Sequence, residues 1–264
     1  MRVTVPLLPA FDCHAHFDHG SPFDTPSGYG GIPDNLHRRD AAWIGEQYRK
    51  LGILGGGFST FASVMEHTEC IAEENEYLFR LSREEDWIRQ WVVVDPRRPE
   101  TFRQAERMLA SPRCLGIKIH PSYHGYDVED YAEALFSFAA EHRAVLLMHP
   151  QKIGRMPAWA DRFPEMKLII AHLGSMAHIE AVGRAKYGNI YTDTSGSASS
   201  LNRVIEYAVE QVGADKILFG TDGYSCAFQY GRIALSCLPD EAKEMILLKN
   251  AQRLFPGAHR SADI

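Results

Sequence analysis

The sequence of 264 residues lacks several features that mark specialised classes of protein. It has only five cysteines, an odd number, and no two of them form a Cys-x-x-Cys pair. This spacing suits neither a disulfide framework nor a zinc finger, so we expect reduced thiols in a cytoplasmic protein. No stretch approaches the roughly 20 apolar residues of a membrane span. The start, MRVTVPLLPAFDCH, has an apolar run too short for the core of a signal peptide.

Positive charge is also scarce. The chain has 28 lysines and arginines against 34 aspartates and glutamates, a net charge of −6, and the basic residues form no cluster. Nucleic acid and anionic membrane surfaces are therefore not expected as partners. A small-molecule substrate is the expected partner, and the composition leaves a homo-oligomer open.

What the sequence does contain is a regular alternation of short apolar runs with longer amphipathic segments. Each run has the length of a strand that is buried on both faces, where hydrophobic residues are nearly continuous. The eight runs are Phe11–His16, Ile53–Thr60, Ile88–Asp95, Cys114–Pro121, Ala144–Pro150, Lys167–Gly174, Asn189–Ser195 and Lys216–Asp222. Helices are expected at Glu69–Leu81, Pro99–Leu109, Asp127–His142, Met176–Lys186, Leu201–Val212 and Pro239–Phe255.

This alternation predicts a closed parallel barrel, the (β/α)8 or TIM barrel, for which about 250 residues are typical. The alternative is an open doubly wound sheet, which usually carries a glycine-rich phosphate loop after its first strand. The first run ends in D-C-H-A-H instead, and Gly55-Gly56-Gly57 lacks the G-x-G-x-x-G spacing. We predict one barrel domain over residues 1–264, with the long loop Phe17–Asp40 covering its mouth.

Metal-binding residue types recur where these runs end, at the face that carries the active site of such barrels. They are His14 and His16 in the first run, Lys118 and His120 in the fourth, His149 in the fifth, His172 in the sixth and Asp222 in the eighth. Because residues i and i+2 of a strand share a face, His14 and His16 point the same way, as do Lys118 and His120. Imidazoles with a carboxylate suit zinc and neighbouring transition metals. The pattern therefore predicts a divalent-metal site at this rim.

The sequence resembles the amidohydrolase superfamily, and within it the amidohydrolase-2 type of metal-dependent barrel hydrolases and decarboxylases. The resemblance covers nearly the whole chain. It rests on D-C-H-A-H at 12–16, G-I-K-I-H-P at 116–121, L-M-H-P at 147–150, I-I-A-H-L-G at 169–174 and L-F-G-T-D at 218–222. These motifs are specific for the superfamily and carry little information about the substrate.

The resemblance implies that His14, His16 and Asp222 hold the first metal. His149 and His172 would bind a second metal, or His149 would join the first site while His172 acts on the substrate. Binuclear members bridge their metals through a carboxylated lysine on strand four, where Lys118 stands, whereas mononuclear members use no bridge. We expect one divalent metal, zinc, beside an unmodified Lys118.

The expected reaction is hydrolysis of a small amide, lactone or cyclic amide. A bound divalent ion lowers the pKa of its water from 15.7 to about 7. Asp222 would accept a proton from that water, and the metal or His172 would polarise the substrate carbonyl. The alternative among enzymes is non-oxidative decarboxylation or hydration of a small carboxylic acid. A barrel that only binds its ligand would have lost metal ligands, and no expected ligand is missing.

Contacts with the substrate are harder to assign from sequence. His120, Tyr123 and Arg155 are the candidates, because they follow the fourth and fifth runs at the predicted rim. Taken singly, Tyr123 and Arg155 are each as typical of a solvated surface residue.

Overall fold

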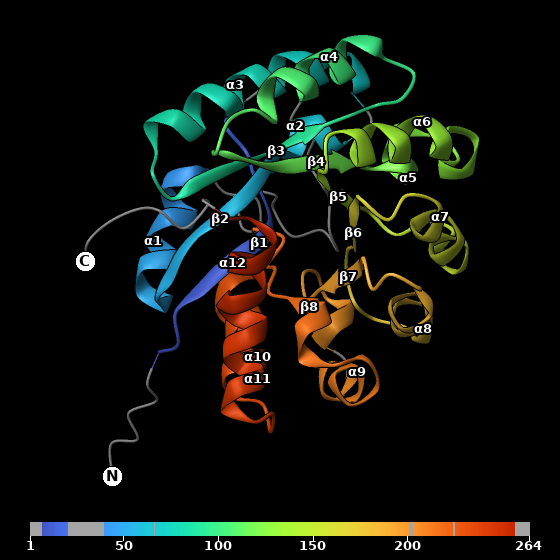
Figure 1. Ribbon diagram of the computed structural model, residues 1–264. Helices are drawn as coiled ribbons and strands as arrows, with labels where there is room; N and C mark the ends of the chain where they lie inside the picture. Colours follow the sequence, from blue (N-terminus) through green and yellow to red (C-terminus); the bar gives the residue numbers. More distant parts are fainter. Residues whose placement is uncertain (1–6, 21–39, 66, 201–202, 224, 257–264) are drawn as a thin grey trace.

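The computed structural model describes residues 7–20, 40–65, 67–200, 203–223 and 225–256. Eight parallel strands run in chain order from β1 to β8, with helices packed around the outside (Figure 1). The strands are β1 (Ala10–Phe17), β2 (Ile53–Thr60), β3 (Ile88–Val93), β4 (Cys114–Ile119), β5 (Val145–Met148), β6 (Lys167–Ile170), β7 (Ile190–Asp193) and β8 (Ile217–Leu218). The predicted (β/α)8 barrel is confirmed, although several strands end earlier than the apolar runs that contain them.

Backbone hydrogen bonds between β1 and the chain after β8 close the sheet. Cys13 N donates to Phe219 O at 2.8 Å, and Asp222 N donates to His14 O at 2.9 Å. Closure leaves no free edge on these two strands. It also brings the first and last predicted metal ligands together, although 208 positions separate them (222 minus 14).

The helices largely follow the amphipathic segments. They are α1 (Ala41–Leu51), α2 (Phe61–Val64), α3 (Ile71–Glu84), α4 (Pro99–Met108), α5 (Pro121–His124), α6 (Val128–Glu141), α7 (Met156–Arg162), α8 (Met176–Arg184), α9 (Val204–Val212), α10 (Cys226–Ala234), α11 (Asp240–Glu244) and α12 (Asn250–Leu254). Short single turns are η3 (Thr68–Cys70), η4 (Ile153–Arg155), η5 (Ala198–Ser200) and η6 (Ala214–Lys216), and η7 (Met245–Lys249) is a π-turn.

Capping explains where the best-predicted helix begins. Asp127 precedes α6 in an extended conformation, and its carboxylate accepts a hydrogen bond from Glu129 N at 3.0 Å, as expected of an N-cap. The single last helix expected over Pro239–Phe255 is instead α11, η7 and α12 in succession. Helices α1, α2, α5, α7 and α10 lie outside the expected helices.

A register shift in β1 determines which side chains enter the barrel. Asp12 pairs with Gly56 and Ala15 with Phe58, so β1 has one more residue than β2 between these two pairs. Such a bulge re-aims the side chains that follow it. Cys13 accordingly packs in the barrel interior with Trp91, whereas Ala15 packs in the outer core. The residues that alternate with Ala15 therefore face the interior.

Two predictions, the loop that covers the barrel mouth and the single domain, stay untested. The cover predicted over Phe17–Asp40 falls mostly on residues 21–39, outside the described residues, so it stays a prediction. The single domain over 1–264 likewise stays a prediction. A membrane span is not found: none of the helices in the described part of the chain is both long and apolar enough to cross a bilayer.

Candidate metal centre

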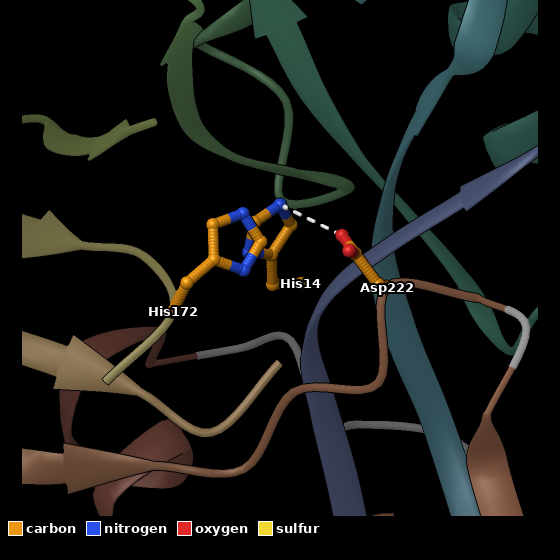
Figure 2. Close-up of side chains that lie close together, drawn as sticks. All are labelled: His14, His172 and Asp222. Atoms are coloured by element: carbon orange, nitrogen blue, oxygen red, sulfur yellow. Dashed lines mark ion pairs between the residues drawn. The ribbon is translucent and has the colours of Figure 1, made fainter. Parts of the chain in front are cut away.

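Three predicted ligands from distant parts of the chain converge at the carboxyl rim of the barrel. His14, His172 and Asp222 each place one ligand atom within 4.8 Å of the others, and the three come from β1 and from the turns after β6 and β8 (Figure 2). His16 adjoins them: its Nε2 lies 3.2 Å from His14 Nε2 and 3.6 Å from Asp222 Oδ1. His14 Nε2 lies 3.7 Å from the same carboxylate oxygen.

Hydrogen bonds on the far side of each imidazole fix its tautomer. His14 Nδ1 lies 3.0 Å from Asp193 Oδ2, and His16 Nδ1 lies 3.1 Å from the carbonyl oxygen of Ser59. An ionised carboxylate and a carbonyl can only accept, so in the neutral rings the proton must be on Nδ1. The Nε2 atoms of His14 and His16 therefore present lone pairs, and these face each other.

His172 has the same arrangement. Its Nδ1 lies 3.2 Å from the carbonyl oxygen of Ser195, which leaves Nε2 for a metal or a substrate. Burial lowers the pKa values of His14 and His16, with Lys118 adding to the effect, so both rings are neutral near pH 7.

Two of the ligands stand on strained backbone. His172 has φ 65° and Asp222 has φ 64°, two of the four non-glycine residues with positive φ in the described chain. This left-handed conformation costs on the order of 1–3 kcal/mol at each residue and persists where the surroundings enforce it. In both cases the strain lies in the turn that carries a candidate ligand over the barrel mouth.

Lys118 lies inside the same cluster. Its side chain is fully buried, and its Nζ lies 2.8 Å from His14 Nε2, the atom that carries the lone pair of this ring. Burial lowers the pKa of Lys118 to about 8, against the opposing pull of Asp222 and Asp193. Burial alone would raise the pKa of Asp222, but His172, His14, His16 and Lys118 lower it to about 2. The centre thus holds an ionised carboxylate beside a cation.

The remaining predicted residues lie at different distances from this cluster. His149 is partly buried, and its ring centroid lies 5.2 Å from that of His172 and 3.9 Å from that of His120. Tyr123 also stacks on His120, at 4.6 Å between ring centroids. Arg155 is exposed and donates to Glu129 Oε1 at 2.8 Å, so the structure directs it toward α6 and not toward the centre.

Sequence reasoning missed the residues that orient the ligands. Asp193, at the end of β7, accepts from the backbone N of His172 at 3.2 Å as well as from His14. The hydroxyl of Ser195 lies 2.9 Å from Nδ1 of both histidines. Asp193 ends β7, within the predicted run Asn189–Ser195. The search for ligands at strand ends could therefore have included it.

A cation fits this arrangement. Two neutral imidazole lone pairs and an ionised carboxylate oxygen converge with no proton between them, and oriented second partners hold the imidazoles. His149 supports the same conclusion, because its Nδ1 is buried and has no hydrogen-bond partner among the described residues. Histidine nitrogens with a carboxylate are a donor set for zinc, manganese and similar divalent metals.

An eight-stranded parallel barrel with a His–His–Asp cluster at its carboxyl rim defines a class of TIM barrels whose active-site face could hold a divalent metal. This chain belongs to the amidohydrolase family described by the Amidohydro_2 model, which matches residues 11–257. The resemblance stated from the sequence motifs is thereby confirmed, and the chain is an enzyme of the amidohydrolase superfamily.

Solved structures share the fold at low sequence identity. A 5-carboxyvanillate decarboxylase from Sphingomonas paucimobilis has a TM-score of 0.77 at 15% identity, covering 94% of this chain and 99% of that one. A dihydroxybenzoic acid decarboxylase from Polaromonas sp. JS666, with bound manganese and 2-nitroresorcinol, has 0.75 at 16%, covering 94% and 97%. An amidohydrolase 2 from Bifidobacterium longum subsp. infantis has 0.64 at 19%, covering 94% and 98%. No curated protein matches the chain.

These comparisons correct the expected reaction. The prediction of a hydrolase of amides or lactones is wrong, because the structural neighbours are mostly dihydroxybenzoate and carboxyvanillate decarboxylases. They favour the alternative reaction instead. The physical reason for the error is that one set of histidine and carboxylate ligands serves either reaction, so the ligand motifs could not distinguish them.

Proposed function

We propose that this chain is a metal-dependent, non-oxidative decarboxylase of a small, hydroxylated aromatic carboxylic acid. The observation that carries the proposal is the juxtaposition of proton-free metal ligands with the buried ammonium of Lys118, 2.8 Å from His14 Nε2. A site that combines a metal with a buried cation favours an anionic substrate. The neighbours support the substrate class, because their names specify dihydroxybenzoate and carboxyvanillate.

In this proposal His14, His16 and Asp222 hold the metal, with His149 and His172 beside it. The bound metal supplies a Lewis acid that neutralises charge on the oxygens of the acid. Lys118 adds a second positive charge on the β4 side of the mouth. Asp222 is ionised at neutral pH and so serves as a ligand and not as a proton donor.

Decarboxylation breaks the bond between the ring carbon and the carboxylate carbon. Carbon dioxide leaves, the electron pair stays on the ring carbon, and that carbon takes up a proton. We assign proton delivery to His172: Ser195 holds the proton on Nδ1, so Nε2 would first take up a proton from solvent and then pass it to the ring carbon. The left-handed backbone at His172 holds the ring over the mouth.

The identity of the metal belongs to the same proposal. Zinc was expected from the ligand types, whereas manganese is bound in three of the neighbouring decarboxylase structures. Both ions accept imidazole and carboxylate ligands. We propose a divalent ion at this site and treat the choice between the two as a matter for direct loading.

The test is a decarboxylation assay on the purified full chain. The protein is stripped with a chelator, reloaded with Mn²⁺ or Zn²⁺, and incubated with 2,6-dihydroxybenzoate or 5-carboxyvanillate. We expect release of carbon dioxide together with the ring product that carries hydrogen in place of the carboxylate. Activity should disappear on chelation and return with one of the two metals.

The matched control is the double variant His14→Ala/His16→Ala. Because it removes two converging lone pairs, it should lose both tightly bound metal and turnover while its far-ultraviolet circular dichroism stays that of a barrel. If no hydroxylated benzoate released carbon dioxide with either metal, or if the double variant kept full metal content, the proposed function or its ligands would be wrong.

A further inference from the structure

His120 differs from the candidate metal ligands in which of its ring nitrogens is fixed. It caps the N-terminus of α5, where its Nδ1 accepts a hydrogen bond from Tyr123 N at 3.2 Å. A backbone N–H can only donate, so Nδ1 must carry the lone pair and Nε2 the proton. This is the reverse of His14, His16 and His172, whose Nδ1 atoms carry the proton.

The ring of His120 is packed against two other rings. His149 stacks on it with centroids 3.9 Å apart and planes 21° apart, and Tyr123 stacks on it at 4.6 Å and 28°. The side chain is 4% exposed, so the ring has no room to turn over. The direction of its Nε2–H is therefore set before any ligand arrives.

The Nε2–H of His120 has no acceptor among the described residues, whose one hydrogen bond to this ring is the one at Nδ1 from Tyr123 N. The ionisable groups around it are His149, Lys118, His124 and His16, which places it at the metal centre. Lys118 shares its strand face two residues earlier. The β4 side of the mouth thus presents N–H donors, whereas the β1, β6 and β8 side presents lone pairs.

We propose that His120 Nε2–H donates a hydrogen bond to an anionic oxygen of the substrate, and that His120 with Lys118 selects carboxylates over their uncharged analogues. This inference rests on the proposed function for the reaction, but it concerns recognition at a named atom. His120 is a substrate-binding residue in this proposal, and Tyr123 and His149 position it.

Two variants of His120 test the Nε2–H donor separately from the stacking of the ring. His120→Phe keeps a flat ring against His149 and Tyr123 and removes the donor, whereas His120→Gln places an amide N–H near the position of Nε2. His142→Phe, an exposed histidine next to α6, is the matched control for the same change away from the mouth. All are compared as full-length, zinc-loaded protein, whose diamagnetic metal permits NMR.

Binding is measured by chemical-shift titration and calorimetry with 2,6-dihydroxybenzoate, with its uncharged amide, and with acetate as the simplest carboxylate. A hydrogen bond to a charged group corresponds to a change of about 10-fold to 100-fold in Kd. We expect His120→Phe to weaken binding of both carboxylates by that factor and to leave the amide within about threefold of the wild type. His120→Gln should recover most of the loss, and His142→Phe should match the wild type.

A second readout does not depend on any ligand. Histidine labelled with ¹⁵N distinguishes the two neutral tautomers, and the signal missing from His120→Phe identifies His120. An Nδ1–H tautomer, or carboxylate affinities in His120→Phe equal to those of the wild type, would overturn the inference. If acetate binding depends on His120 but no aromatic acid is decarboxylated, the inference stands and the proposed function fails. If decarboxylation occurs and binding ignores His120, the reverse holds.

Discussion

At the scale of single residues, the centre depends on the groups behind the ligands as much as on the ligands. Asp193 accepts the Nδ1 proton of His14, and its other oxygen accepts the backbone N–H of His172 and of Ser195. Its carboxylate is held ionised: burial would raise the pKa of Asp193, but His14 and the other hydrogen-bond partners lower it well below its usual value. One side chain thus sets the tautomer of one ligand and the position of another.

The first prediction concerns Asp193→Asn. The amide keeps the shape of the carboxylate but turns an N–H toward His14 Nδ1, so His14 must take the opposite tautomer and place its proton on Nε2. We expect the affinity for Mn²⁺ or Zn²⁺ to fall by about 10-fold to 100-fold, as for other partners that orient metal ligands. Chelator competition measures the change.

The control for this variant is Asp215→Asn in η6, which precedes β8 and so lies at the amino end of the barrel. It makes the same chemical change away from the centre and should leave the metal affinity unaltered. Equal metal affinities in Asp193→Asn and the wild type would show that the tautomer of His14 is not set by Asp193.

The second prediction concerns Lys118 and the number of metals. A lysine that bridges two metals must carry a carbamate, whereas an ammonium beside one metal needs no modification. We expect one metal per chain in the wild type, and the same content in Lys118→Met, whose side chain fills a similar volume without charge. Elemental analysis counts the metal, and anomalous diffraction locates it. Two full-occupancy metals joined by density from Lys118, with metal lost from Lys118→Met, would contradict a single-metal site.

At the scale of elements, the turns after the strands place the ligands, and glycine is required in one of them. Gly223 follows Asp222 at φ 89°, and a Cβ there would lie 2.0 Å from the backbone oxygen of His16. No side chain fits so close to a main-chain oxygen without moving it. The turn after β8 and the end of β1 are therefore packed backbone against backbone, with a candidate ligand on each.

The third prediction compares two glycine substitutions. Gly125 ends α5 at φ 70°, and a Cβ there would meet nothing within 4 Å, so Gly125→Ala should cost only the left-handed strain, about 1 kcal/mol of unfolding free energy. Gly223→Ala adds the clash with His16 and should cost about 3 kcal/mol or more. It should also weaken metal binding, because either His16 or Asp222 must shift.

Denaturant unfolding measures both variants, and calorimetry with Zn²⁺ measures the metal. A Gly223→Ala protein as stable as Gly125→Ala, with wild-type metal affinity, would mean that the turn after β8 has room to relax without disturbing the ligands.

At the scale of the whole molecule, burial of histidines makes stability depend on pH. His124 is an example that is not itself a candidate metal ligand: it is 4% exposed, and its Nε2 donates to Ser63 O at 3.1 Å. Burial lowers the pKa of His124 to about 4, with Asp95 opposing the shift and Arg97 and Lys118 adding to it. The folded state therefore resists protonation of this ring.

The fourth prediction follows from the sign of that shift. Between about pH 6.5 and pH 4 the unfolded chain binds a proton at His124 that the folded chain does not, so stability falls as the pH is lowered through this window. The full difference corresponds to about 3 kcal/mol. His124→Gln keeps a donor for Ser63 and has no titration, so its unfolding free energy should fall less than that of the wild type over the same range.

Urea unfolding at several pH values between 4 and 7 gives the comparison. His142→Gln, at an exposed position, is the control and should follow the wild-type profile. Parallel profiles for His124→Gln and the wild type would show that His124 is protonated equally in the folded and unfolded states.

The barrel and most of its candidate ligands could be predicted from the amino-acid sequence. Strands buried on both faces are nearly continuous apolar runs, and parallel strands end at one rim, so the polar residues at those ends had to meet. His14, His172 and Asp222 could be brought together on that argument alone, and Asp127 could be identified as a helix cap from its local pattern.

The orientation of these ligands depends on contacts between distant parts of the chain. The partner of His14 stands 179 positions away on β7, and that of His16 stands 43 positions away on β2, so no local pattern links them. The bulge in β1, the left-handed turns at His172 and Asp222, and the outward pairing of Arg155 with Glu129 arise from packing between elements. Hydrogen-bond direction and backbone strain depend on which groups contact each other across the barrel. Those contacts form only when the chain has folded, so no local sequence pattern shows them.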